Sequence, residues 1–425
     1  MKKRLVGFFL FLSLITRAQT DCRQQDYQHQ LLQLNPQTSS QYQQIENFIS
    51  KHKQTLRVDG NVDSSSSSPL VQAAPIKIVV PVVVHVLWNN NAQNITDAQV
   101  LSQLDVLNKD YSGTNTDRKK VPAYFSALAA DCGISFALAK TDPKGKPTNG
   151  IVRTQTSIIS FSYDDKMKAS ATGGDDAWDA NSYLNIWVCN LTNGITGYSS
   201  VPGGPTAKDG VVITTNAFGT INKTGIYNLG RTATHEIGHW LNLRHIWGDA
   251  SCGDDLVDDT PSQQGPNRGC NSGEKFSCGT TAHGDMYMNF MDFSDDACMY
   301  MFTNGQGKRM RLLFEVGGPR NSILYSAGLT GTGLPLDTAI AGSDVSMEVL
   351  LYPNPAVQTI TMQVNKDNGA SGKTIMLYNQ MGQMLRTFRL ISKQQPIDIS
   401  ELKPGIYFIK MEGAGKNAMM KFVKQ

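Results

Sequence analysis

The feature that most restricts how this chain can fold is residues 234–249, which read THEIGHWLNLRHIWGD and hold three of the seven histidines. His235 and His239 are four residues apart. On a helix they therefore lie about one turn apart on the same face, and both imidazoles can reach one ion. Glu236 lies beside the first histidine, where its carboxylate can reach a metal-bound water without being a ligand.

Asn242 and His245 complete this pattern. The chain must turn sharply after His239 if His245 is to return to the same ion, and asparagine is the best non-glycine residue for a left-handed turn position. An isolated HExxH pattern also arises by coincidence on amphipathic helices. The third histidine favours a functional site, because three neutral ligands and one open position are typical of catalytic zinc.

The composition suits a loop-rich extracellular protein. The chain has 425 residues, enough for two or three domains with their own cores. Its net charge of +3 gives no indication of nucleic-acid binding, and its 18% of charged residues is below the usual quarter.

The N-terminus is predicted to be a secretory signal peptide over residues 1–18. Basic residues at positions 2–4 precede an apolar run over residues 5–15, and residues 16–18 end in a small-residue cleavage site. The run is too short for a transmembrane anchor, and no later stretch of about 18 apolar residues follows. We therefore expect a secreted protein without an anchor, in a compartment where disulfides can form.

Residues 19–75 are predicted to be a pro-segment that ends in a flexible linker. They are polar and rich in glutamine, with a short helix expected over residues 40–52 and five serines at 64–68. Cys22 is a candidate zinc ligand of a latent state, because a thiolate can fill the open coordination position. The alternative is an incidental free cysteine.

A folded domain is predicted over residues 76–327. Residues 76–87 are β-branched and apolar, which indicates a buried strand containing a structural His85, and residues 96–111 have the pattern of an amphipathic helix. This alternation indicates an α/β half-domain that leads into the metal-bearing helix. Further elements are expected as strands over residues 133–139, 150–155, 183–190 and 211–214, and as a closing helix over residues 303–315.

Four of the cysteines lie in the region after the histidine motif. The chain has seven cysteines, so at least one is free or intermolecular. Cys189 lies in an apolar run and is predicted to be a small buried side chain, while the sequence assigns no role to Cys132. The cysteines placed to join the long loops here are Cys252, Cys270, Cys278 and Cys298.

An acidic run over residues 254–260 is a candidate calcium loop. Like-charge repulsion disfavours such a run unless a hard cation is present, although a solvated acidic loop is the alternative. Downstream, Met291 is placed to form a hydrophobic floor under the histidines in a tight turn. The candidate calcium ligands are Asp254, Asp255, Asp258, Asp259 and Thr260.

The C-terminal part is predicted to be a small all-β sandwich over residues 347–425, after a linker over residues 328–346 that is rich in Gly, Thr, Ser and Ala. The sandwich has no cysteine or histidine, so its role should be binding or addressing. Its expected strands cover residues 349–352, 359–364, 374–378, 387–390, 406–409 and 418–423.

Residues 76 to about 325 resemble the pappalysin family of metzincin metallopeptidases, in its small bacterial branch. The resemblance rests on HEIGHWLNLRH followed by IWGD, on DDLVDDTP, and on MNFMDFSDDACMYMF. It implies an α+β catalytic domain with a mixed twisted sheet, helices and a loop-rich C-terminal subdomain. It also implies that Glu236 is the general base and acid, that Met291 is the methionine of the Met-turn, and that the zinc ligands are His235, His239 and His245.

The same resemblance implies two further features and shows two departures. It implies disulfides Cys252–Cys278 and Cys270–Cys298, and it places the aspartate of the S1′ pocket at Asp296, which predicts cleavage before Arg or Lys. Asn242 stands where the family usually has glycine. Phe293 stands where it often has a tyrosine that stabilises the tetrahedral intermediate. Loss of one such donor typically costs about 10²- to 10³-fold in rate, so we expect reduced or retuned activity.

The C-terminal domain is similar to the type IX secretion sorting domain. The similarity rests on YPNP at residues 352–355, LKPGIY at 402–407 and the terminal KFVKQ. It implies an address that is read by the outer-membrane export machinery. The alternative is a carbohydrate-binding or adhesive sandwich.

Together these patterns predict a secreted zinc endopeptidase, made as a latent zymogen, that acts on proteins or peptides. A strand through residues 194–201 could pair with an extended substrate. Two alternatives stay open on the sequence alone: a secreted binding or adhesion protein with a vestigial zinc site, and a zinc hydrolase that acts on something other than peptides.

Overall fold

The computed structural model describes most of the chain beyond the predicted signal peptide. It describes residues 22–58 except 36, residues 78–329 except 280–282 and 316, and residues 349–425 except 365–373, 381–382, 391, 393 and 412–417. The signal peptide, the serine run and most of the predicted interdomain linker therefore lie outside the described residues. No helix in the described part is long and apolar enough to cross a membrane.

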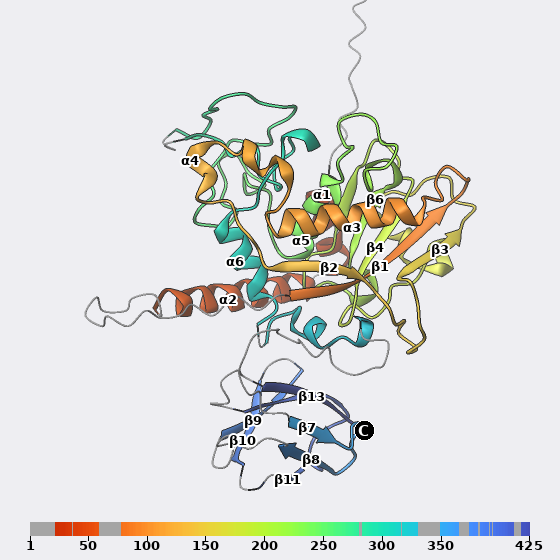
Figure 1. Ribbon diagram of the computed structural model, residues 1–425, viewed down its shortest axis with the longest axis vertical. Helices are drawn as coiled ribbons and strands as arrows, with labels where there is room; N and C mark the ends of the chain where they lie inside the picture. Colours follow the sequence, from red (N-terminus) through yellow and green to blue (C-terminus); the bar gives the residue numbers. More distant parts are fainter. Residues whose placement is uncertain are drawn as a thin grey trace, which may run out of the picture.

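A six-stranded mixed sheet forms the centre of the catalytic unit, in the order β2-β1-β4-β6-β5 with β3 paired to the other end of β1 (Figure 1). Strand pairs are parallel except β5 with β6. β1 and β4 are buried almost throughout, because parallel strands carry cover on both faces. The strands are β1 (Ile78–Trp88), β2 (Ile134–Leu138), β3 (Ile151–Gln155), β4 (Leu184–Cys189), β5 (Gly197–Ser199) and β6 (Val211–Thr214).

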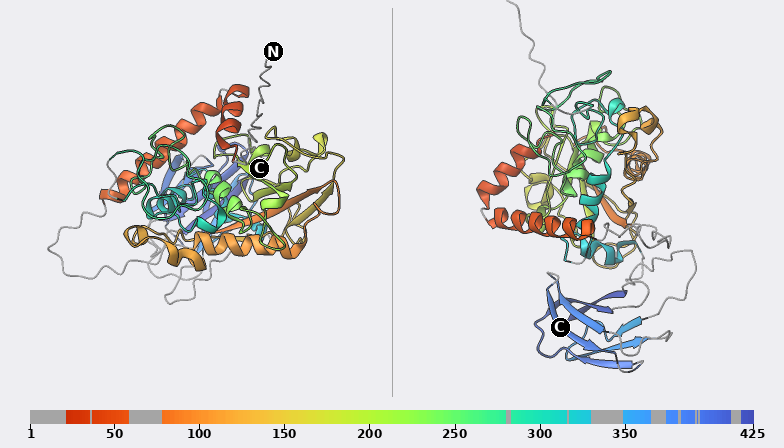
Figure 2. Two further views of the ribbon diagram at one scale, coloured as in Figure 1. Left: turned by 90° about the horizontal axis from the view of Figure 1, so that it is seen from above. Right: turned by 90° about the vertical axis from the view of Figure 1, so that its left-hand side faces the viewer.

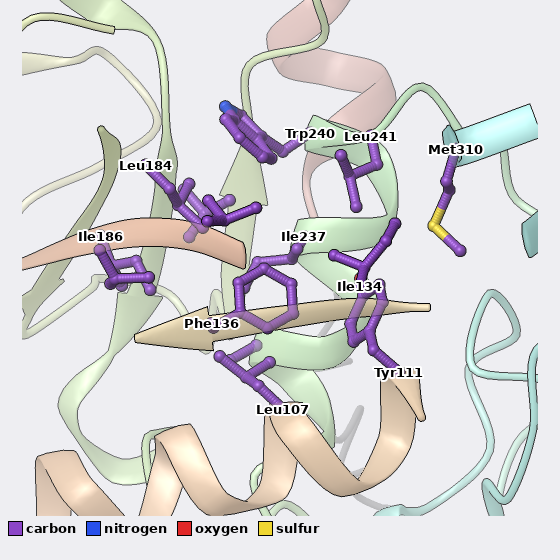
Figure 3. Packing of buried hydrophobic residues seen from close by; sticks show 14 of the residues in the cluster. Leu107, Tyr111, Ile134, Phe136, Leu184, Ile186, Ile237, Trp240, Leu241 and Met310 are labelled. Atoms are coloured by element: carbon purple, nitrogen blue, oxygen red, sulfur yellow. The ribbon is translucent and has the colours of Figure 1, made fainter. Parts of the chain in front are cut away.

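Two helices, α3 (Asp97–Tyr111) and α5 (Arg231–Trp240), pack on one face of this sheet and make the main core. α3 begins where the Thr96 side chain accepts a hydrogen bond from the Gln99 backbone. Figure 3 shows α3 side chains meeting those of β2 and α5, Leu107 and Tyr111 among them. The packing holds α5, and with it the histidine motif, against the sheet.

The N-terminal segment packs on this unit as two helices, α1 (Gln24–Leu34) and α2 (Gln37–Val58), drawn in red in Figure 2. The predicted short helix is therefore much longer, and a further helix precedes it. Tyr27 and Leu31 are one helical turn apart and buried, and Ile49 of α2 joins the main core. The described part of the segment buries a few apolar side chains at helical spacing against the catalytic unit.

Beyond α5 the chain is mostly loops, as expected, and it closes with α6 (Asn304–Leu312), while the short α4 (Ala123–Ser126) precedes β2. Thr303 and Gln306 form a capping box at the start of α6. Disulfides join Cys252 to Cys278 and Cys270 to Cys298, the pairs that the family resemblance implies. The other cysteines, Cys22, Cys132 and Cys189, are free, and the last two are buried.

The C-terminal strands form two antiparallel sheets, with strand orders β10-β9-β12-β13 and β11-β8-β7, around a common apolar cluster. β11 reads QQPID and was not predicted, because it is polar, contains proline and gains its strand character from pairing with β8. The strands are β7 (Val349–Tyr352), β8 (Thr359–Val364), β9 (Thr374–Asn379), β10 (Met384–Arg389), β11 (Gln394–Asp398), β12 (Gly405–Met411) and β13 (Ala418–Lys424). The small all-β sandwich is confirmed.

Candidate active site

Three imidazoles converge at the C-terminal end of α5. His239 Nε2 lies 3.1 Å from His235 Nε2 and 3.1 Å from His245 Nε2. Asn242 has a φ of 65°, which confirms the predicted left-handed turn that brings His245 back. Leu243 donates its backbone N–H to Gly238 O at 2.9 Å and closes this turn.

Each histidine is oriented through its other ring nitrogen. Because carbonyl and carboxylate oxygens only accept, each Nδ1 carries the proton and each Nε2 keeps a lone pair directed at the common centre. The acceptors are Phe290 O at 2.7 Å for His235, Leu243 O at 2.9 Å for His239, and Asp249 Oδ1 at 2.5 Å for His245.

This donor set fits zinc. Zinc–nitrogen bonds of about 2.1 Å in a tetrahedron require nitrogens about 3.4 Å apart, close to the observed spacing. Burial, with His245 nearby, lowers the pKa of His235 to about 3, and burial also lowers the pKa of His239 well below its ordinary value. Neutral imidazoles are the form that binds metal.

Glu236 points into the same centre. It is fully buried, and neither carboxylate oxygen has a hydrogen-bond partner among the described residues. Burial raises its pKa to about 8, against an opposite effect of the neighbouring Cys22 side chain. Gly197 of β5 leaves room for it, since a Cβ there would lie 3.0 Å from Glu236 Cγ.

The thiol of Cys22 lies at this centre too. Its Sγ is 3.8 Å from His239 Nε2, and the ligand atoms of Cys22, His235, His239 and His245 all lie within 4.8 Å of one another. The tertiary fold thus brings the candidate latent-state ligand to the histidines from a position more than 200 residues away in sequence.

Met291 and Phe293 line the centre from the segment after Asn289. Met291 is fully buried beneath α5, and a Cβ at Gly238 would lie only 2.4 Å from its sulfur. The Phe293 ring centroid lies 5.6 Å from that of His235 and 4.9 Å from that of His245. The Phe293 ring therefore lies directly beside two of the three converging imidazoles.

Asp296 lines a partly open hollow that adjoins Glu236 and His235. Its Oδ2 accepts hydrogen bonds from the backbone N–H groups of Leu229 at 2.8 Å and Arg231 at 3.2 Å, and so holds the start of α5. Burial raises its pKa to about 6, while these backbone donors lower it.

The carboxylates of the acidic loop make separate contacts. Asp259 accepts from Thr303 Oγ1 at 2.6 Å and Gly305 N at 2.8 Å, so it holds the start of α6. Asp255 Oδ1 accepts from Thr260 Oγ1 at 2.8 Å, and its buried Oδ2 has no hydrogen-bond partner in the described part of the chain. Asp254 bonds within its own turn, to the backbone of Leu256.

Two features of the site were missed from sequence. Asp249 orients His245. This contact could have been recognised in the sequence, because Asp249 follows His245 by four residues. The second is a buried ion-pair network behind α5, in which Arg231 pairs with Asp110 and with Asp117 at 2.9 Å. Asp110 also accepts from Thr234 at 2.7 Å. These partners are more than 100 residues apart in sequence, so no local pattern connects them.

Comparisons with known proteins agree with this site. Residues 168–315 match the family described as pregnancy-associated plasma protein-A, a peptidase family, and residues 350–425 match the secretion system C-terminal sorting domain. An extracellular metalloprotease of Arthroderma benhamiae is 32% identical over 266 residues, which cover 60% of this chain and 78% of that protein. One from Pyricularia oryzae is 32% identical over 247 residues, which cover 56% and 75%.

Solved metallopeptidase structures are also similar to this chain. Mature mirolysin of Tannerella forsythia, in complex with a cleaved peptide, is 46% identical with a TM-score of 0.59, covering 62% of this chain and 99% of that one. A promirolysin mutant from the same organism is 42% identical with a TM-score of 0.64, covering 74% and 99%.

Fold, site and comparisons define a secreted metalloendopeptidase. The chain belongs to the pappalysin family of metallopeptidases and carries a type IX secretion sorting domain at its C-terminus. The sorting domain indicates an extracellular or outer-surface location.

Proposed function

We propose that the chain is a zinc endopeptidase made as a latent zymogen, and that it cleaves peptide bonds before Arg or Lys. The observation that carries the activity is the cluster of His235, His239 and His245 around one point, with the buried carboxylate of Glu236 beside it. The three imidazoles would hold the zinc ion.

The chemistry divides between the ion and the protein. Zinc, when bound, polarises the scissile carbonyl and lowers the pKa of a water toward about 7. Glu236 takes the proton of the attacking water and passes it to the leaving amine. The hydrogen bonds from each Nδ1 fix the tautomer and the orientation of the imidazoles, and Met291 lies buried beneath α5.

The activity is tested with the processed enzyme and a mixed peptide library. Cleavage should stop with a chelator and return with zinc, and Glu236→Ala should abolish cleavage while the protein keeps one zinc per chain. Full activity of the Glu236→Ala variant, or activity that persists after all metal has been removed, would overturn the mechanism.

Latency is supported by the position of Cys22, whose thiol reaches the histidine cluster and would close the open coordination position. Cys22→Ala should give the full-length chain measurable activity before processing. Cys132→Ala is the matched control, since it removes another free thiol, buried in the core. Equal latency of the two variants would argue against a thiol switch.

Specificity for Arg or Lys is supported by Asp296, which lines the hollow beside Glu236 together with a second aspartate, Asp292. A calcium ion in the acidic loop is supported by the buried Oδ2 of Asp255, which has no hydrogen-bond partner among the described residues. For the C-terminal sandwich we propose recognition by the type IX export machinery. Deleting residues 347–425 should leave the protein in the periplasm, as immunoblots of cell fractions would show.

A further inference from the structure

Tyr27 of the N-terminal segment fills a pocket built by the catalytic unit. Its side chain is 1% exposed, and its ring centroid lies 4.6 Å from that of Tyr198. Its hydroxyl donates to Asp165 Oδ2 at 3.0 Å and accepts from Lys168 Nζ at 3.3 Å. The phenol is therefore recognised by its ring and by both hydrogen-bonding functions of its hydroxyl.

The polar floor of this pocket is held together without Tyr27. Lys168 Nζ lies 2.9 Å from Asp165 Oδ1 and donates to Lys208 O at 2.8 Å. The same ammonium lies 5.0 Å from the ring centroid of Tyr198 and 5.4 Å from that of Trp187. The site should therefore keep its donor, its acceptor and its aromatic wall when the N-terminal segment leaves.

The pocket adjoins the edge of the sheet that an extended peptide would use. β5 pairs with β6 on one side only, and its other edge is covered by the N-terminal segment. Arg23 N donates to Gly197 O at 3.1 Å, and Ser199 N donates to Gln24 Oε1 at 3.0 Å. Removing the segment exposes this edge and the pocket together.

The points at which the two pockets meet β5 indicate the direction in which a substrate peptide would run. Thr196, which precedes β5, lines the hollow that contains Asp296. We assign this hollow to the side chain of the residue after the scissile bond. Gln24 meets Ser199, at the other end of β5, and Tyr27 follows on the helix that starts there. A side chain in the Tyr27 pocket therefore belongs to a residue that precedes the scissile bond.

We propose that, in the processed enzyme, the pocket formed by Asp165, Lys168, Trp187 and Tyr198 binds the phenol side chain of a substrate tyrosine on the N-terminal side of the cleaved bond. This subsite rests on the proposed peptidase function. A phenylalanine would fill the ring space but leave the hydroxyl partners of the pocket unmatched, and such a mismatch is worth about tenfold in binding.

The test uses the full chain after activation, with the N-terminal segment separated. Matched fluorogenic peptides carry Tyr, Phe or Ala at each of the four positions before one scissile bond. One position should favour Tyr over Phe by about tenfold in kcat/KM. Equal values for Tyr and Phe at all positions would overturn the proposal.

Lys168→Met tests the pocket itself, because it keeps the aliphatic stem and leaves Asp165 paired with Lys208 at 3.3 Å. It should reduce the Tyr-over-Phe ratio to below about twofold. Lys166→Met is the control, since Lys166 lies on the same short turn but is exposed and pairs with Asp164. A ratio unchanged in Lys168→Met, or lost equally in both variants, would contradict the assignment.

A binding measurement separates this inference from the peptidase activity. A labelled peptide of residues 22–35, with Cys22 replaced by Ala, is titrated with the processed protein and followed by fluorescence polarisation. Replacing Tyr27 by Phe should weaken binding about tenfold, and equal affinities would overturn the phenol pocket. If the pocket discriminates but no peptide is cleaved, the proposed peptidase function fails and the recognition of phenol stands.

Discussion

Glu46 of α2 and Arg309 of α6 form an ion pair, with Glu46 Oε1 2.5 Å from Arg309 Nη2. The same oxygen accepts from Asn242 Nδ2 at 3.0 Å, and Arg309 Nε donates to Asn242 O at 2.9 Å. The N-terminal segment thus holds the turn between His239 and His245 as well as the centre reached by Cys22. Glu46 and Cys22 are thus two separate points at which the segment contacts the histidine motif.

Replacing Glu46 should therefore weaken latency while the thiol is intact. Glu46→Gln removes a largely buried charge–charge bond, so activation of the full-length chain should be about tenfold faster, as measured by the time course of activity after limiting protease. Gln43→Ala, on the exposed side of α2, is the control. Unchanged activation in Glu46→Gln would show that the thiol alone maintains latency.

Phe293→Tyr should raise turnover. The Phe293 ring lies beside His235 and His245, so we expect a hydroxyl added to it to reach the centre between the imidazoles and to donate to the developing oxyanion. We expect kcat to increase by about tenfold or more with little change in KM. The comparison is made at equal zinc content, and equal kcat values would show that the hydroxyl has no role in this enzyme.

Asp296→Asn should relax specificity. The amide can still accept the backbone bonds at the start of α5, but the negative charge in the hollow is lost. Preference for Arg or Lys over a neutral residue after the scissile bond should fall about 10- to 100-fold, measured as ratios of kcat/KM. Asp295→Asn, at the adjacent position outside the hollow, should keep the preference. Retained preference in Asp296→Asn would assign specificity elsewhere.

Asp255→Asn should change the pH dependence of stability. Burial raises the pKa of Asp255 to about 7, whereas an unfolded aspartate has its ordinary value of 3.8. The native state therefore binds this proton more tightly. Its contribution to stability is fully present below about pH 4 and is lost as the pH rises through about 7, by up to about 1.4 kcal/mol per pH unit.

The variant removes this loss, so its thermal midpoint without calcium should exceed that of the wild type at pH 8 and match it at pH 4. Added calcium should raise the wild-type midpoint at pH 8 but not that of Asp255→Asn. A wild-type midpoint that does not respond to calcium would remove the acidic loop as a calcium site.

Several parts of the site followed from sequence because their causes are local. The four-residue spacing of His235 and His239 places both on one helical face, and Asn242 supplies the left-handed turn within the same motif. The buried strands β1 and β4 were predicted for a similar reason, since a run of β-branched residues has few other stable environments.

The contacts of the acidic loop could not be predicted from local sequence. The run of carboxylates suggested one cation site, but Asp259 is used to hold the start of α6 through Thr303 and Gly305, more than 40 residues later. Such a cap is a tertiary contact, and no feature of the run itself distinguishes it from a metal ligand.

The sequence by itself determined which residues can bind the metal and which can move the proton, because those properties depend on residue type and short spacing. Only the tertiary structure decided which surfaces of the catalytic unit the N-terminal segment contacts. Cys22, Tyr27 and Glu46 reach partners 138 to 263 residues away in sequence. These contacts depend on which surfaces the folded sheet and helices place beside α1 and α2, and a polar, glutamine-rich composition does not encode that placement.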